Sequence, residues 1–201
     1  MGNTSTTILL ATANPHKAAE LQRMLEDVGI EVLTLADLPS EISGEQVEED
    51  EPTLEGNALK KARYWADRSG LSTLADDTGL EVEALGGAPG VFSARYAGED
   101  ATYEDNVRKL LAELQGTEER KAQFRTVLAL ISSEGEYLFD GRCEGVILDE
   151  IRGAGGFGYD PIFLPLGFEK TFAEMDATEK NAISHRGRAL HAFVEWVKQQ
   201  R

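Results

Sequence analysis

The N-terminal part of the chain alternates between short apolar runs and stretches with helical periodicity. Ile8 to Ala13 is a short apolar run, which is typical of a buried β-strand. Asn14-Pro15 follows directly, and proline is favoured in the first turn of a helix. Gly29 is placed to end that helix, and Glu31 to Leu35 predicts a second strand. The expected helix has one apolar face, made of Ala18, Leu21, Leu25 and Val28. A strand–helix–strand order of this kind indicates an α/β protein.

The middle of the chain contains two further sets of apolar residues at helical spacing, each forming an apolar stripe along a predicted helix, and one predicted strand. Ser72 to Ala75 predicts a strand that ends at the turn-like pair Thr78-Gly79. Gly86 to Gly90 predicts another turn, and Thr102 is suited to cap a helix. The apolar stripes are Leu54, Ala58, Ala62 and Trp65 in the first helix, and Val107, Leu110, Leu111 and Leu114 in the second.

The C-terminal part predicts a hairpin and a final helix. Ala122 to Ser132 and Tyr137 to Leu148 flank a short polar turn, as in a long antiparallel hairpin. Gly153 to Gly158 is a glycine-rich turn, and the final helix carries the stripe Leu190, Phe193, Val194 and Val197. The order of elements predicts a long mixed β-sheet flanked by helices, in one domain (1–201) with a cleft between two lobes.

Charge and cysteine content narrow the classes of partner and compartment. Acidic residues outnumber basic ones by 36 to 20, giving a net charge of −16 over 201 residues. Such a chain is not expected to bind nucleic acid or a membrane through bulk charge, since phosphate neutralisation needs clustered Lys and Arg. Cys143 is the single cysteine, which points to a core position and to a reducing, cytoplasmic compartment. Ile8 to Ala13 is too short for a signal peptide or a membrane span.

The turn Thr12 to Lys17 joins a predicted strand to a predicted helix. Backbone N–H groups at a helix N-terminus attract anions, and Lys17 adds a full positive charge there. Thr12 and Asn14 add short hydrogen-bonding side chains. The segment is therefore a candidate phosphate cradle, although it lacks the glycines of a Walker A loop. The alternative is a capped helix with a solvated lysine.

Two adjacent carboxylates, Asp76 and Asp77, follow the predicted strand at Ser72 to Ala75. Neighbouring strand residues point to opposite faces, so at most one of the two faces a given metal site. Mg²⁺ takes oxygen ligands, typically one or two carboxylates together with substrate phosphates. The acidic stretch Glu48 to Glu51 is a candidate source of a second carboxylate. The alternatives are ordinary turn chemistry in Asp77-Thr78-Gly79 and a solvated acidic face at Glu48 to Glu51.

The segment Gly155 to Pro161 combines glycines, aromatic rings and an acid. Glycines permit close backbone approach to a ligand, and Phe157 or Tyr159 suits stacking on a base. Asp160 can accept hydrogen bonds from a base edge or from the loop itself. The alternative is a tight connection between strands whose aromatic rings belong to the core.

Lys180 and the tripeptide Ser184-His185-Arg186 place three basic side chains close together in an acidic chain. Arg is a rigid donor fork and His a tunable donor, so these residues are candidates for holding phosphates or a base. The alternative is a helix capped by Ser184 with exposed cations.

Taken together, four motifs in their order along the chain resemble the Ham1-like family of inosine/xanthosine triphosphate pyrophosphatases. The resemblance extends from the Thr12–Lys17 turn to the C-terminal helix. The motifs are Ala75-Asp76-Asp77-Thr78-Gly79-Leu80, Gly86-Gly87-Ala88-Pro89-Gly90 with Ser93-Ala94-Arg95-Tyr96, Gly156-Phe157-Gly158-Tyr159-Asp160-Pro161, and Ile183-Ser184-His185-Arg186-Gly187. The resemblance implies a Maf/Ham1-like fold with a nucleotide cleft, a homodimer, and Mg²⁺-dependent cleavage between the α- and β-phosphates of ITP, dITP or XTP.

The resemblance also implies a role for each matching residue. Asp77 is the expected catalytic carboxylate and a Mg²⁺ contact. Glu49 falls where the family places a second metal acid, in a loop where Glu48 or Asp50 could take its place. Ala13 replaces a glycine that many relatives carry. The implied substrate-binding residues are Thr12, Ala13, Asn14, Pro15, His16, Lys17, Thr78, Phe157, Gly158, Tyr159, Asp160, Lys180, His185 and Arg186.

These roles predict a mechanism and leave two rival functions open. Asp77 would accept a proton from the water that attacks the α-phosphorus, and Lys17 would offset charge on the leaving pyrophosphate. Donors such as His185 or Arg186 would match the 6-oxo group of hypoxanthine and xanthine and oppose the 6-amino group of adenine. The rivals are a Maf-like pyrophosphatase acting on other modified nucleotides and a non-catalytic nucleotide-binding protein.

Overall fold

The computed structural model describes residues 6–25 and 29–200, which divide into two compact units. Unit 1 contains the described residues up to Asp77, together with Val127–Asp140 and those from Ala189 onward. Unit 2 contains Thr78–Thr126 and Gly141–Arg188. Among the described residues, no helix is long and apolar enough to cross a lipid bilayer.

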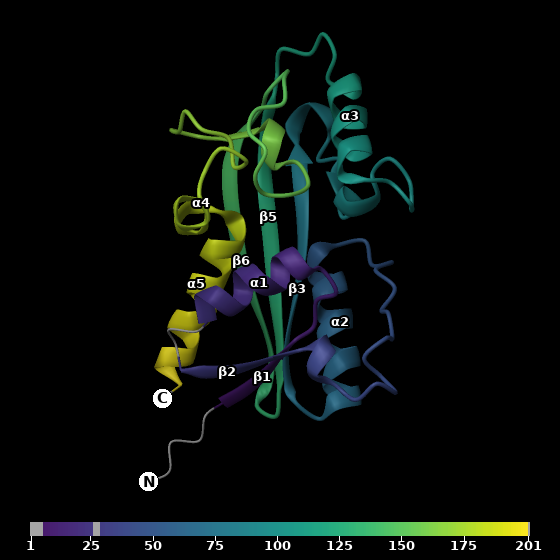
Figure 1. The fold of residues 1–201 in the computed structure, drawn as a ribbon, viewed down its shortest axis with the longest axis vertical. Coiled ribbons are helices and arrows are strands. Elements are labelled where there is room, and N and C mark those ends of the chain that lie inside the picture. Colours follow the sequence, from purple (N-terminus) through teal and green to yellow (C-terminus); the bar gives the residue numbers. More distant parts are fainter. Residues whose placement is uncertain (1–5, 26–28, 201) are drawn as a thin grey trace. The chain divides into compact units, whose positions relative to one another are not determined.

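Helices and strands alternate over residues 6–82, and beyond this point strands follow strands and a helix follows a helix (Figure 1). The strands are β1 (Thr6–Leu10), β2 (Ile30–Thr34), β3 (Ser72–Val82), β4 (Pro89–Gly90), β5 (Lys121–Ser132), β6 (Gly135–Ile147) and β7 (Phe163–Pro165). The helices are α1 (Pro15–Leu25), α2 (Leu54–Ser69), α3 (Tyr103–Glu113), α4 (Ala177–Ile183) and α5 (His185–Gln199).

The described strands form one seven-stranded sheet in the order β2-β1-β3-β5-β6-β7, with β4 paired to β3. β1 runs parallel to β2 and β3, whereas the pairs β3–β4 and β6–β7 are antiparallel. Only Ser133 and Glu134 connect β5 to β6, a connection that is short enough only for an antiparallel pair. The mixed sheet flanked by helices confirms the predicted fold class.

In unit 1 the central part of strand β1 is buried on both faces. Three successive residues of β1, Ile8 to Leu10, are almost inaccessible to solvent, as expected for parallel strands that are covered on both sides. One apolar core includes Leu21 and Leu25 of α1 and Phe193 of α5. The predicted stripe of α2 is buried as well, at Leu54, Ala58, Ala62 and Trp65. Val28, which was predicted to extend the apolar face of α1, lies outside the described residues.

In unit 2 helix α3 and several aromatic rings form a second apolar core. Thr102 caps α3 as predicted, because its side chain accepts a hydrogen bond from the backbone N–H of Asp105. Val107, Leu110 and Leu114 of α3 are buried. They share a core with Phe124 of β5, Phe163, Phe172 and Cys143. Cys143 is thus a core residue as predicted, and burial raises the pKa of its thiol to about 11.

The predicted turn at Thr78-Gly79 is wrong, because β3 continues through it to Val82. Two contacts hold this segment extended. The hydroxyls of Thr78 and Thr126 share a hydrogen bond of 2.7 Å. Gly79 also lies so close to β4 that a Cβ there would be 2.6 Å from the carbonyl oxygen of Gly90. The short elements α4 and β7 were not predicted either.

Candidate active site

Asp76 and Asp77 lie within β3, rather than at its end, and their side chains have separate partners. Asp76 is buried and pairs with Lys17 of α1 at 2.7 Å. Asp77 is also buried and accepts a hydrogen bond of 3.1 Å from the Asn57 amide of α2. Adjacent residues of a strand point to opposite faces, which accounts for the two sets of partners. The two carboxylates still share electrostatic neighbours, because Lys17 also acts on Asp77 and Asp76 also acts on Lys61, so the expectation that at most one of them faces a given site stays a prediction.

A lysine that was not among the predicted site residues lies beside Asp77. The Lys61 ammonium of α2 is 3.7 Å from Asp77 Oδ1 and forms an ion pair with Glu49 Oε1. Burial alone would lower the pKa of Lys61, but the carboxylates of Asp77, Glu49 and Asp76 together raise it, so the side chain is a cation. A signal was present in the sequence, since Asn57 and Lys61 are one helical turn apart and flank the buried stripe of α2.

Burial raises the pKa of Asp77 above its ordinary value, against the opposing influence of Lys61 and Lys17. Glu49 acts in the same direction as burial, because a second carboxylate nearby disfavours ionisation. A buried carboxyl group with a raised pKa is a stronger proton acceptor than a solvated one once it is ionised. Asp77 therefore has the properties that a general base requires.

Within the acidic stretch, Glu49 is the residue whose carboxylate reaches the surroundings of Asp77. It is half-buried against Lys61, whereas Asp50 is exposed and pairs with Lys60. Glu48 is exposed. Of the three acids that the sequence left open, Glu49 is thus the one that shares a cation with Asp77.

Glu49 and Asp77 provide a suitable donor set for a divalent metal ion. Both carboxylates already contact one positively charged group, the Lys61 ammonium. In the described ranges 6–25 and 29–200, no three His, Cys, Asp or Glu side chains gather in a way that could hold a metal ion. Two carboxylates match the chemistry of Mg²⁺, which completes its coordination with water and substrate oxygens.

The segment Thr12 to Lys17, which was predicted to hold phosphate, forms the capped start of helix α1, and its lysine is paired with a carboxylate. The side-chain oxygen of Asn14 accepts hydrogen bonds from the backbone N–H groups of His16 and Lys17, at 3.0 and 3.3 Å. The Thr12 hydroxyl accepts another from the N–H of Asn14. Some donors that were expected to face a phosphate are therefore used in capping. Lys17 is held by Asp76 rather than solvated, while Ala13, Pro15 and His16 are exposed.

In unit 2 the structure brings Phe157, Asp160 and Lys180 together. Lys180 is buried and pairs with Asp160 Oδ2 at 2.8 Å, and the same oxygen accepts a hydrogen bond from the Phe157 backbone N–H. The Lys180 ammonium lies 4.9 Å from the centre of the Phe157 ring, within the range of a cation–π interaction. The Asp160 carboxylate therefore holds both the Phe157 backbone and the Lys180 ammonium in place.

His185 and Arg186 are buried, so the alternative of exposed cations at this helix start is wrong. The His185 ring stacks on Phe124 with centroids 4.6 Å apart, and the Arg186 guanidinium lies 5.6 Å from the Phe157 ring centre. The Ser184 hydroxyl caps α5 by accepting a hydrogen bond from the Gly187 N–H. A side chain would not fit at Gly187, since a Cβ would lie 1.9 Å from the carbonyl oxygen of Asn181.

Two further residues of the predicted set have mainly structural partners. Tyr159 is buried in the core of unit 2, and its hydroxyl donates a hydrogen bond of 2.9 Å to the carbonyl oxygen of Ser93. Thr78 is bonded to Thr126. Of the two aromatic rings that suited base stacking, Phe157 is the half-buried one and Tyr159 belongs to the core.

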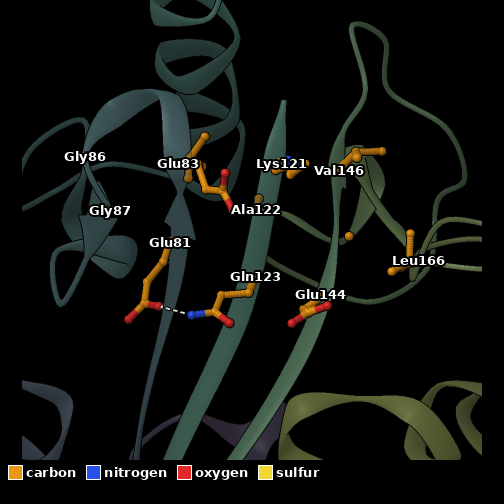
Figure 2. A pocket seen from close by; sticks show the side chains of 12 residues that line it. Glu81, Glu83, Gly86, Gly87, Lys121, Ala122, Gln123, Glu144, Val146 and Leu166 are labelled. Carbon is orange, nitrogen blue, oxygen red and sulfur yellow. Dashed lines mark hydrogen bonds between the residues drawn. The ribbon is translucent and has the colours of Figure 1, made fainter. Parts of the chain in front are cut away.

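A cavity of 610 Å³ on unit 2 includes none of the predicted residues. Figure 2 shows three of its carboxylates, Glu81, Glu83 and Glu144, with Gln123 donating a hydrogen bond of 2.6 Å to Glu81. Lys121 is the one cation in its lining. Because this charge balance repels a polyphosphate, the cavity is unsuited to a nucleoside triphosphate.

Comparison with known proteins supports the resemblance seen in the sequence. The Ham1 family model matches residues 8–196. The chain is similar to the dITP/XTP pyrophosphatase of Caldanaerobacter subterraneus, at 49% identity over 94% of this chain and 95% of that one. It is also similar to the dITP/XTP pyrophosphatase of Chlorobaculum tepidum, at 52% identity over 95% of this chain and 92% of the relative.

Solved structures show the same fold. The Ham1 protein of Staphylococcus aureus matches with a TM-score of 0.87 and 36% identity, covering 97% of this chain and all (100%) of that one. A HAM1 protein from Coxiella burnetii matches with a TM-score of 0.87 and 42% identity, covering 96% and 98%. The family match, the relatives and the shared fold together establish that the chain belongs to the Ham1 family.

Proposed function

We propose that this protein hydrolyses dITP, ITP and XTP to the nucleoside monophosphate and pyrophosphate, and so removes non-canonical purines from the nucleotide pool. The observation that carries the proposal is the cluster of Asp77, Glu49 and Lys61, which unites a buried carboxylate of raised pKa with a second acid and a half-buried cation. The name that the relatives share supplies the substrate class.

Asp77 is the proposed proton acceptor for the attacking water. Asp77 and Glu49 would hold Mg²⁺, which when bound would neutralise phosphate charge and polarise the bond that breaks. Lys17 is held at the start of α1 by Asp76 and offsets the negative charge that develops on the leaving pyrophosphate. The carboxylate of Asp76 thus sets the position of Lys17.

The buried basic side chains of unit 2 suit recognition of the base. Phe157 offers a half-buried ring for stacking, and Lys180, His185 and Arg186 are donors near it or in the adjoining helix start. Donors directed at position 6 match the oxygen of hypoxanthine or xanthine and face a donor in adenine. Leaving such a group without a partner costs about 1–3 kcal/mol, which corresponds to roughly 5- to 150-fold in discrimination.

A pyrophosphate-release assay tests the function. Purified protein is incubated with Mg²⁺ and dITP, XTP, dATP, dGTP or dTTP in turn. We expect rapid pyrophosphate release from dITP and XTP and slow release from the other three. Release of single phosphates, or equal rates on all five, would point to a general phosphatase, and tight binding without turnover would point to a regulatory protein.

The neighbouring lysines of α2 provide a matched pair of variants. Lys61→Met removes the half-buried cation between Asp77 and Glu49, so the two like charges repel and the acids lose their common partner. We expect pyrophosphate release to fall roughly 10- to 100-fold, as when a partner of a metal ligand is removed. Lys60→Met is the control, because Lys60 pairs with the exposed Asp50. Equal losses in both variants would contradict the role of Lys61.

We also propose that the protein works as a cytoplasmic homodimer on free nucleotides, without stable nucleic-acid or membrane partners. The single cysteine supports the compartment, the net charge of −16 supports the absence of nucleic-acid and membrane partners, and the dimer rests on the family resemblance. Light scattering coupled to gel filtration measures the mass in solution, and a monomer at all concentrations would contradict the dimer.

A further inference from the structure

Asn57 is a fully buried polar residue in a helix, at 0% exposure. Asparagine is a poor helix former, and a buried amide is costly unless both its donor and its acceptor are satisfied. Here both are satisfied outside the helix. The amide Nδ2 donates to Asp77 Oδ2 at 3.1 Å, and Oδ1 accepts from the Glu51 backbone N–H at 3.0 Å.

The two hydrogen bonds connect Asp77 to the acidic loop. Glu51 is two residues beyond Glu49, so fixing its backbone restrains where the Glu49 carboxylate lies. At Asp77 the bond engages Oδ2, while Oδ1 faces the Lys61 ammonium that also binds Glu49. One amide thereby orients one acid and holds the loop of the other. Only a side chain with a donor and an acceptor at this reach can do both, which excludes Asp, Leu and Ala.

We propose that Asn57 is a positioning residue that fixes the Asp77 carboxylate and the Glu49 loop in one geometry for binding a divalent cation. This inference rests on the proposed function, because it takes Asp77 and Glu49 as the metal acids. Hydrogen-bond partners of metal ligands orient those ligands and tune their affinity.

Asn106 of α3 offers a matched control. It also is the fourth residue of its helix, follows a threonine N-cap and is buried. It accepts a hydrogen bond from the Ala97 backbone N–H at 2.7 Å and donates one to the Ala94 carbonyl oxygen at 3.0 Å. The two asparagines differ in what the amide donates to, which is a carboxylate for Asn57 and a backbone carbonyl for Asn106.

The test compares Mn²⁺ binding to the wild type, Asn57→Ala and Asn106→Ala, measured from the electron paramagnetic resonance signal of free Mn²⁺. Each variant loses the two hydrogen bonds of a buried amide side chain, so both are expected to melt at a lower temperature. We expect Asn57→Ala to bind Mn²⁺ roughly tenfold or more weakly and Asn106→Ala to bind it as the wild type does. Unchanged Mn²⁺ affinity in Asn57→Ala, equal weakening in both variants, or no Mn²⁺ binding by the wild type would overturn the proposal.

A second variant keeps the test decisive if Asn57→Ala does not fold. Asn57→Asp preserves the volume and the acceptor for the Glu51 N–H, but it cannot donate to Asp77 when ionised. We expect its kcat to fall while its KM for dITP stays near the wild-type value, because the lost contact concerns the acids rather than the nucleotide. Wild-type kcat in this variant would overturn the proposal. Turnover by the wild type tests the proposed function separately, since the Mn²⁺ comparison requires no catalysis.

Discussion

Asp77→Asn is expected to lower the rate of pyrophosphate release by about 10³-fold, within the range that loss of a general base produces. The amide keeps the shape of the side chain but accepts no proton and carries no charge for a metal ion. The substitution also removes one of the two carboxylates that contact Lys61. The measurement is single-turnover pyrophosphate release from dITP at saturating Mg²⁺.

Two controls accompany Asp77→Asn, which are the melting temperature of the variant and the activity of a matched substitution at Asp67. Burial raises the pKa of Asp77, so the charge on this carboxylate costs folding free energy at pH values above the ordinary pKa of an aspartate. The neutral variant should therefore melt no lower than the wild type. Asp67→Asn, at an exposed position of α2, should retain full activity. Near-normal turnover by Asp77→Asn would show that the base is another residue.

Elements with strong local periodicity could be predicted from the sequence alone. The stripe of α2 and the cap of α3 follow from residues within one or two turns of each other, so neither needs knowledge of the fold. The long hairpin of β5 and β6 likewise follows from two β-prone runs around a polar turn.

The error at Thr78-Gly79 had a non-local cause. Asp-Thr-Gly is favourable turn chemistry, but the contacts that keep β3 extended come from Thr126 and Gly90, which are distant in sequence. Helix α4 was missed for a different reason. Its start carries a local capping box, in which Asp176 and Glu179 each accept a backbone N–H, and this signal was present in the sequence.

The chemistry of the candidate site could be predicted only in part, because burial decides it. Lys61 is one of eight lysines in the sequence, and its position beside the buried stripe of α2 does not reveal its partners Glu49 and Asp77, which only the fold brings to it. In the same way, Lys17 was expected to be solvated or bound to phosphate, and its pairing with Asp76 depends on the fold bringing the start of α1 to this residue of β3. Sequence motifs indicate which residues belong to a functional site, whereas the ion-pair partners of those residues can be identified only in the folded structure.

Lys180→Met is expected to have the largest effect on stability. Lys180 and Asp160 form a buried pair at 2.8 Å, with side chains that are 7% and 4% exposed. Methionine matches the length of the lysine chain but leaves a buried carboxylate without this ammonium. Removing one member of a buried ion pair costs about 3–5 kcal/mol in the free energy of unfolding, because the remaining charge is desolvated. Urea denaturation followed by circular dichroism measures the change.

A double-mutant cycle separates this cause from simple loss of packing. In the Lys180→Met background, Asp160→Asn removes the stranded charge while its side-chain oxygen can still accept the Phe157 N–H. The double variant should therefore regain much of the lost stability, with a coupling energy of about 1–3 kcal/mol. Lys170→Met is the control, since Lys170 pairs with Glu179 at the exposed surface and such pairs contribute about 1 kcal/mol or less. Additive losses in the cycle would mean that Lys180 stabilises unit 2 through its contacts with the Phe157 and Phe172 rings, 4.9 and 5.6 Å away, rather than through its charge on Asp160.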